Sequence, residues 1–202
     1  MSLLFNTPEF IVFFIFVLVV ISSLKFRKFQ HLFLVGSSYF FFYISNNFLI
    51  SLLIYSTLLD FYLGKAIFNT KDKTKKKLLL IISLVGNLGL LGFFKYVNFM
   101  IGEVNGIVEY FGMSQIDHLE IILPIGISFY TFQTISYTVD IYRGKLTPSN
   151  SFWEFALFVS FFPQLVAGPI LRASHFLPQL REKLAKENVV SRLRTISMHH
   201  AS

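Results

Sequence analysis

The 202-residue sequence contains no cysteine and few charged residues. The absence of cysteine excludes a disulfide-stapled fold and thiolate metal sites. Only 14% of the residues are charged, whereas 54% are hydrophobic and 26 are Phe. A soluble domain carries about 25% charge, so this sequence cannot cover a globule of its size with a hydrated surface. The composition excludes soluble enzymes, disordered tails and collagen-like chains, and it predicts a protein embedded in a lipid bilayer.

Basic residues outnumber acidic residues, 18 to 11, which gives a net charge of +7. In a soluble protein this excess would suggest nucleic acid as a partner. Here the Lys and Arg residues lie between the hydrophobic runs, where the preference of positive charge for the cytosolic side of a membrane explains them better. We therefore expect the lipid bilayer, and no nucleic acid, as a partner.

Five hydrophobic segments approach the length of about 20 residues that a helix needs to cross a bilayer. They cover residues 8–24, 29–44, 48–68, 78–101 and 121–139. We predict an all-α fold, a polytopic transmembrane helical bundle of about five spans. Asp60 lies within the third segment, and the nearby Lys65 favours a position at the cytosolic boundary over a proton-relay role. Gly86, Gly89 and Gly92 recur every three residues in the fourth segment and predict close helix packing.

The order of charges predicts how the spans are oriented. Only Glu9 accompanies the start of the first segment, whereas Lys25, Arg27 and Lys28 follow it directly. This order is the reverse of a cleavable signal peptide, so we expect a retained span with its amino terminus outside the cytosol. Alternation then places residues 64–77 and 172–202 in the cytosol. Residues 102–120 lie outside, in a stretch without Lys or Arg between Tyr96 and Tyr142.

The hydrophobic run at residues 152–162 is too short to cross. It contains Trp153 and Glu154 and is ended by Pro163. At about 1.5 Å per residue it reaches roughly half of the hydrocarbon thickness, and basic residues stand on both sides. We predict a re-entrant or interfacial segment. The basic tail at residues 177–202 is typical of a cytosolic surface helix on anionic lipid.

The fifth span carries a polar stripe at helical spacing. The stripe comprises Tyr130, Gln133, Tyr137 and Asp140, with Thr131, Thr134 and Thr138 beside it. The opposite side collects Ile125, Phe129, Phe132, Ile135 and Val139. Two interpretations stay open: hydrogen bonds between helices, or the wall of a cavity that a substrate enters. Pro124 and Gly126 near the start of the span, and the stretch 161–169, predict breaks in regular helix.

Histidine offers no catalytic base from its pattern alone. The five residues are His31, His118, His175, His199 and His200. None lies within a span beside Ser, Asp or Asn at a spacing that would form a catalytic triad. The sequence also has no phosphate-binding glycine loop and no cluster of metal ligands. We assign no catalytic and no metal-binding residue.

Four motifs resemble one known family. They are LPIGISFYTFQ at 123–133, DIYRG at 140–144, FPQLVAGPI at 162–170 and NLGLLGFFKY at 87–96. Their order and spacing resemble the membrane-bound O-acyltransferases, in particular the branch of the alginate O-acetyltransferases and the related teichoic-acid D-alanyl transferases. The resemblance runs from about residue 80 to residue 182.

The resemblance implies a helical bundle around a funnel, in which an acyl group from a cytosolic donor such as acetyl-CoA reaches a hydroxyl of an exported polysaccharide such as alginate. It implies a multi-pass protein of the bacterial cytoplasmic (inner) membrane, a co-substrate in place of a bound cofactor, and an extracytoplasmic acetylation partner. The candidates for the chamber lining are Tyr130, Gln133, Tyr137, Gln164, Gly168 and Pro169. All except Tyr137, which comes from the polar stripe, match positions in the motifs.

The resemblance also implies that the catalytic His of the family lies downstream of the motif at 162–170. We therefore expect this chain to be the amino-terminal part of a longer enzyme, truncated and inactive alone. Residues 1–188 would form the amino-terminal part of the family's domain and residues 189–202 a divergent cytosolic tail. The alternatives are a transporter-like bundle with broken helices and an inactive remnant or interaction module.

Overall fold

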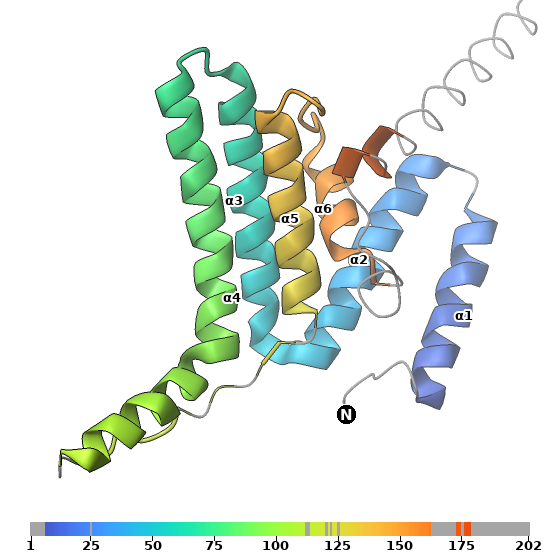
Figure 1. Cartoon of the computed structure of the whole chain (residues 1–202). Coiled ribbons are helices and arrows are strands. Elements are labelled where there is room, and N and C mark those ends of the chain that lie inside the picture. The colour runs from blue at the N-terminus through green and yellow to red at the C-terminus, as the bar shows by residue number, and fades with distance from the viewer. Residues whose placement is uncertain are drawn as a thin grey trace, which may run out of the picture.

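The computed structural model of the chain describes residues 7–24, 26–111, 114–119, 121, 123–124, 126–162, 173–174 and 176–178. All regular structure in these residues is helical. The helices are α1 (Pro8–Ser23), α2 (Arg27–Asn46), the short 3-10 helix η1 (Asn47–Leu49), α3 (Ile50–Asn69), α4 (Lys73–Tyr110), α5 (Ile127–Tyr142) and α6 (Phe152–Ser160). Figure 1 shows them side by side, with α3 against α4 and α5, and α6 between α5 and α2.

Side-chain caps adjacent in sequence start three of these helices, α1, α4 and α6. Thr7 caps α1, with Pro8 at the first helical position where a missing backbone donor costs little. Asp72 caps α4, because its carboxylate accepts hydrogen bonds from the backbone N–H groups of Thr74 and Lys75 at 2.8 and 3.4 Å. Ser151 accepts a hydrogen bond from the backbone N–H of Glu154 and caps α6. These ends are set by residues adjacent in sequence.

Two helix ends depend on unusual backbone conformations. Asn47 has a φ of 49°, in the left-handed region that Asn tolerates, and turns the chain from α2 into η1 and α3. This turn lies at the predicted loop between the second and third spans. Gly126 has a φ of 82° and precedes the first residue of α5. Glycine adopts this conformation without a steric cost, so α5 starts after it and not at residue 121 as predicted.

Each of the five predicted spans coincides with a helix, but two bounds were wrong. In addition to the late start of α5, α4 continues to Tyr110, beyond the predicted end at residue 101. By length and composition, two helical stretches of the described chain suffice to cross a membrane: Phe29–Asn69, which turns at Asn47, and α4. The number of five crossings stays a prediction.

The bundle interior contains many polar side chains beside its apolar core, and large apolar side chains are exposed on its outer side. Its interior holds a run of buried polar side chains from α3, α4 and α5: Ser56, Thr57, Asp60, Ser83, Asn87, Thr131, Gln133, Thr134, Thr138 and Asp140. Large apolar side chains such as Val85, Phe93 and Phe132 are exposed on the same helices. Water would not stabilise this arrangement, whereas lipid would, since polar groups in a membrane face the protein interior.

Helix α6 is short and enclosed by the bundle. Its nine residues span about 14 Å, and every residue from Glu154 to Ser160 is buried. Phe155 packs against Tyr137 of α5 with ring centroids 4.3 Å apart. A segment that enters a membrane without crossing requires this burial. Its re-entrant course stays a prediction, because residues 163–170 lie outside the described residues.

Several predicted features cannot be placed for the same reason. Gln164, Gly168 and Pro169 lie outside the described residues, as do His175, His199, His200, Ile125 and the domain boundary at 188–189. The cytosolic tail is described only at residues 177 and 178.

Candidate functional site

The structure confirms the two faces predicted for α5. Tyr130, Gln133 and Tyr137 are buried, and so are Asp140 and the threonines beside them: Thr131, Thr134 and Thr138. On the opposite side, Phe129 and Phe132 are 38% and 46% exposed. Three of the six chamber candidates therefore lie on one buried, polar helix face in the middle of the bundle.

A hydrogen-bonded cluster joins this face to α3 and α4, and we call it the Asp60 cluster: Asp60, Ser83, Asn87, Thr134 and Thr138. Ser83 Oγ donates to Asp60 Oδ1 at 2.6 Å, and Asn87 Nδ2 donates to Asp60 Oδ2 at 2.7 Å. From α5, Thr134 Oγ1 donates to Asn87 Oδ1 at 3.2 Å, and Thr138 Oγ1 lies 3.0 Å from Ser83 Oγ. The cluster is completely buried and cross-links three helices.

The structure gives Asp60 partners within the bundle, and its predicted position at the cytosolic boundary stays a prediction. Its side chain has no exposed surface and lies in the bundle interior. The partners that make this position tolerable are neutral donors on α4, the fourth predicted span, four residues apart. Ser83 and Asn87 are 23 and 27 positions from Asp60 in sequence, so no sequence pattern indicated these partners.

Close helix contacts occur at one of the three predicted glycines, Gly86, and at Gly64, which was not predicted. A Cβ on Gly86 would lie 2.7 Å from Leu59 Cδ2, which confirms a close approach of α4 to α3. A Cβ on Gly89 or Gly92 would meet nothing within 4 Å, so packing does not explain these two. The tightest contact is at Gly64 of α3, where a Cβ would lie 2.6 Å from Tyr137 Cε1. Gly64 allows the ring of Tyr137 to lie against the α3 backbone.

A second network connects Tyr137 to the loop between α5 and α6. The backbone N–H of Ser149 donates to the hydroxyl of Tyr137 at 3.0 Å. Ser149 Oγ donates to Glu154 Oε2 at 2.6 Å and is within 3.0 Å of the Ser151 carbonyl oxygen. Sequence reasoning did not identify Ser149, which lies outside any helix and carries no pattern. The network fixes the loop and the carboxylate of Glu154 relative to the polar face of α5.

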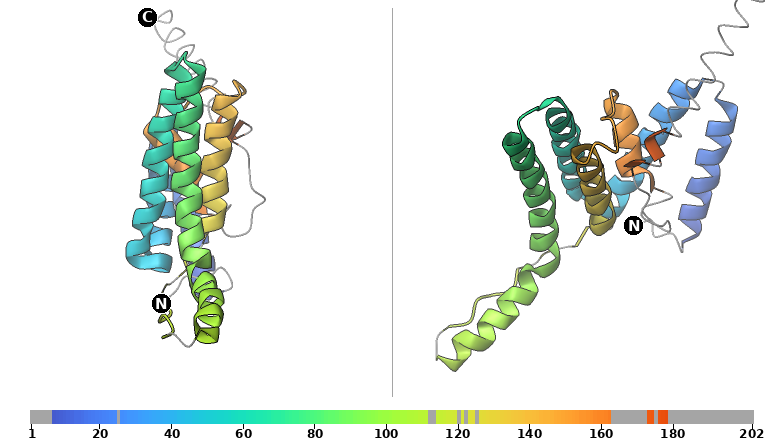
Figure 2. Two further views of the ribbon diagram at one scale, coloured as in Figure 1. Left: turned by 60° about the vertical axis from the view of Figure 1, so that its left-hand side comes forward. Right: turned by 45° about the horizontal axis from the view of Figure 1, so that its top comes forward.

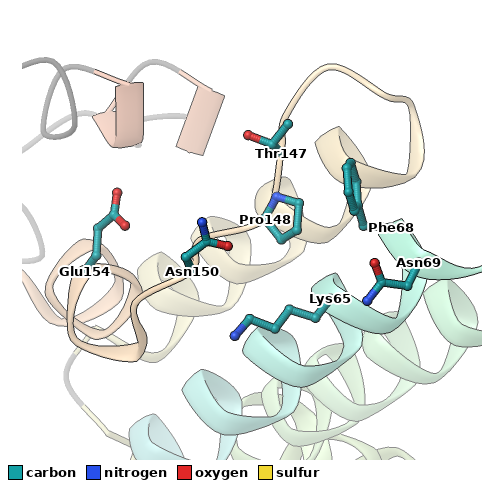
Figure 3. Close-up of a pocket in the computed structure, with 7 residues that line it drawn as sticks. All are labelled: Lys65, Phe68, Asn69, Thr147, Pro148, Asn150 and Glu154. Carbon is teal, nitrogen blue, oxygen red and sulfur yellow. The ribbon is translucent and has the colours of Figure 1, made fainter. Parts of the chain in front are cut away.

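Glu154 also lines a cavity of about 680 Å³ at the same end of the bundle. The other lining residues come from the end of α3 and from the loop before α6: Lys65, Phe68, Asn69, Thr147, Pro148 and Asn150. Figure 3 shows Lys65 extending from α3 below this loop, with Glu154 on the other side of the opening. The Lys65 ammonium lies 4.0 Å from the centre of the Phe61 ring. The cavity has the size of a small-molecule site, and its wall includes one basic residue, Lys65, and one acidic residue, Glu154.

Two buried polar atoms distinguish the two interpretations of the polar stripe. Hydrogen bonding between helices accounts for Thr134 and Thr138, whose hydroxyls contact α4. It does not account for the Tyr130 hydroxyl or for Gln133 Oε1, which are buried without a hydrogen-bond partner in the described structure. Buried polar atoms are rarely left unpaired. Asp140 Oδ2, at the other end of the same face, is also buried without such a partner in the described structure, so both ends of this face are suited to a further polar group.

The described histidines do not complete a reaction centre. His31 lies near the start of α2, and His118 is exposed beyond the end of α4. Neither lines the cavity. In the described part of the chain, no three His, Asp or Glu side chains are grouped so that they could hold a metal ion. Among the described residues, neither histidine is placed to act as a general base at the cavity.

Comparisons with known proteins identify relatives over most of the chain. A peptidoglycan O-acetyltransferase of Helicobacter pylori is 36% identical over 90% of this chain and 39% of its own length. Probable alginate O-acetylases of Pseudomonas aeruginosa and Pseudomonas putida are 34% and 32% identical over 90% of this chain. The chain covers 35% and 38% of these two relatives, well under half of their length. No protein-family model and no solved structure matches the chain.

These relatives are members of one family, which is the family that the motifs resemble. The identity extends beyond the motifs, since it covers nine tenths of the chain, which includes α2 and α3. The chain belongs to the membrane-bound O-acyltransferase family.

Proposed function

We propose that this chain is part of an O-acetyltransferase that acylates an exported polysaccharide. The acetyl group comes from a cytosolic donor, acetyl-CoA or another acyl donor, and the acceptor is a hydroxyl of a glycan such as alginate. The observation that carries the proposal is the identity of at least 30% to named O-acetyltransferases over 90% of the chain. The buried polar face of α5 supports it, because an acyl-transfer chamber in a membrane needs such a wall.

The proposed setting is the bacterial cytoplasmic membrane, crossed five times with the amino terminus outside. The positive charge at residues 71–77, between α3 and α4, supports this orientation. It puts Lys65 and the cavity at the cytosolic end of the bundle. A donor entering there first meets Lys65 and Glu154, and the network through Ser149 leads from Glu154 to Tyr137.

In this proposal the described helices shape the chamber and exclude water from it. Exclusion of water protects a reactive acyl donor from hydrolysis, and Tyr130 and Gln133 offer hydrogen bonds to a reacting group. Acyl transfer to a hydroxyl also needs a general base. We propose that this base is supplied by a part of the family's fold that this chain does not contain, and that an extracytoplasmic protein assists delivery to the polysaccharide.

The test is an acetyl-transfer assay in membrane vesicles with radiolabelled acetyl-CoA and alginate or a model glycan. The 202-residue chain alone is expected to transfer no label. Co-expression with the unmatched remainder of the Helicobacter pylori relative is expected to restore transfer. Turnover by the chain alone that is abolished by replacing one of His118, His175, His199 or His200 would contradict the proposal.

A pair of Tyr→Phe variants in the active assembly separates chamber from scaffold. Tyr137→Phe removes the hydroxyl that holds Ser149, whereas Tyr62→Phe removes one from a side chain that is 64% exposed. We expect about a tenfold loss of rate for Tyr137→Phe, since small displacements of chamber groups are costly. Tyr62→Phe should retain the full rate. Equal rates for both variants would show that the Tyr137 hydroxyl has no role in the chamber.

A further inference from the structure

Helix α4 is longer than a bilayer is thick. Its 38 residues span about 57 Å, compared with about 30 Å for the hydrocarbon core. Figure 1 shows its last part bending away from the bundle and projecting alone, and both views in Figure 2 show the same projection. We call residues 98–111 the α4 extension.

An extended segment, residues 114–119, lies along one face of the α4 extension, and we call it the strap. Asn98 Nδ2 donates to the Leu119 carbonyl oxygen at 2.7 Å, and the Leu119 N–H donates to Asn98 Oδ1 at 2.9 Å. Asn105 forms the same pair of bonds with Ile116, at 2.8 and 2.7 Å. Each asparagine thus binds the backbone of one strap residue at two points.

The two pairs fit because the spacings agree. Asn98 and Asn105 are seven residues apart on a helix, about 10.5 Å. Leu119 and Ile116 are three residues apart on an extended chain, about 10 Å. Gly102 lies between the two asparagines on the same face, and a Cβ there would already lie 3.8 Å from His118 Cε1. The strap therefore provides hydrogen-bond partners for Asn98 and Asn105 on this face of the α4 extension.

The opposite face of the α4 extension is mostly apolar, with Glu103 at its edge, and it is exposed in the described structure. It comprises residues at helical spacings of four, three and four: Met100, Val104, Ile107 and Phe111. Met100, Ile107 and Phe111 are 62%, 61% and 70% exposed. This face continues the exposed apolar side of α4 within the bundle, which includes Val85 and Phe93. The polar strap and the apolar face make the α4 extension amphipathic, a pattern typical of helices in a membrane interface.

We propose that the α4 extension lies in the membrane interface, with its apolar face in contact with lipid acyl chains and the strap toward water. Continuity with the apolar outer side of α4 argues for lipid as the occupant. The charges argue for neutral lipid, because residues 97–119 contain Glu103, Glu109 and Asp117 and no Lys or Arg. The lack of Lys and Arg in these residues favours the non-cytosolic end for the element. The proposal rests on insertion of the bundle into a membrane and does not depend on acyl transfer.

The test uses nitroxide spin labels on single cysteines of the full chain in lipid nanodiscs. The chain has no native cysteine, so each label reports one position. Ile107→Cys probes the apolar face, Asp117→Cys probes the strap, and Val85→Cys is the matched lipid-facing control within the bundle. All three side chains are on the surface of the described structure, so labelling leaves the core intact. Collisions with oxygen, which partitions into lipid, are compared with collisions with a water-soluble nickel chelate.

We expect the labels at Ile107 and Val85 to collide more with oxygen and the label at Asp117 to collide more with the nickel chelate. The preference at Ile107 should be the same in neutral phosphatidylcholine and after addition of anionic lipid. A label at Ile107 that prefers the nickel chelate, or that both reagents fail to reach, would overturn the proposal in favour of water or a protein partner. If the label at Val85 collided more with the nickel chelate than with oxygen, the bundle would not be inserted in the membrane, and the proposal would be wrong as well.

Discussion

Asparagine side chains of α4 perform different tasks in two regions of the molecule. In the bundle, Asn87 is completely buried and bridges Asp60 of α3 and Thr134 of α5. In the α4 extension, Asn98 and Asn105 hold the backbone of the strap in an exposed position. The first arrangement joins helices through side chains, and the second joins a helix to an extended segment.

The surroundings determine how much each arrangement contributes. When a buried partner is removed, the remaining donor or acceptor has no water to replace it and keeps its full desolvation cost. In the exposed strap, water takes the place of a lost hydrogen bond. The same residue type should therefore be essential in the bundle and dispensable for its stability in the α4 extension. Three sets of variants test this difference.

The largest effect is expected for Asp60→Ala. The change leaves Ser83 Oγ and Asn87 Nδ2 buried without their acceptor, at a cost of about 3 kcal/mol in the free energy of unfolding. Asp60→Asn keeps the volume and one acceptor oxygen, so its loss should be smaller. The measurement is helicity by circular dichroism during titration with a denaturing detergent. A stable Asp60→Ala variant would show that the Asp60 cluster does not hold the three helices together.

A somewhat smaller loss is expected for Gly64→Ala. The new Cβ would lie 2.6 Å from the ring of Tyr137, which is held by Phe155 and by the Ser149 N–H. Overpacking of this kind costs about 2 kcal/mol. The matched control is Gly89→Ala on α4, where the Cβ meets nothing, and helix propensity favours Ala by up to about 1 kcal/mol. Equal unfolding midpoints for the two variants would show that Gly64 and Tyr137 do not pack as closely as the structure describes.

The smallest effect on global stability is expected for Asn98→Ala and Asn105→Ala. Each change removes two exposed hydrogen bonds, and the loss should be about 1 kcal/mol or less. The effect should be local instead. Hydrogen exchange should accelerate at the backbone amide of Leu119 in Asn98→Ala and of Ile116 in Asn105→Ala, with the unfolding midpoint of the bundle unchanged. A midpoint shift as large as that of Asp60→Ala would mean that the strap supports the bundle.

Hydrophobic periodicity was sufficient to predict most helices and the two faces of α5. Tyr130, Gln133 and Tyr137 are buried as the helical spacing required, and Phe129 and Phe132 are exposed. The partners of Asp60 could not be predicted, because they come from another helix. Gly64 carried a weak signal that was overlooked, as it lies four residues after Asp60 on the same face. Asn98, Gly102 and Asp117 gave none, since the strap has no regular pattern.

The sequence alone determined that the chain is helical, that its apolar surface requires lipid, and that it belongs to the membrane-bound O-acyltransferase family. Composition, hydrophobic periodicity and motifs can be read directly from the order of the residues, without the fold. The tertiary structure alone decided which polar side chains meet, since Asp60 with Asn87, Tyr137 with Ser149 and Asn105 with Ile116 are separated by 27, 12 and 11 positions. Such pairs form only when packing has fixed the helices. A hydrogen bond requires a short distance between two atoms, and a repeating pattern in the sequence does not specify that distance.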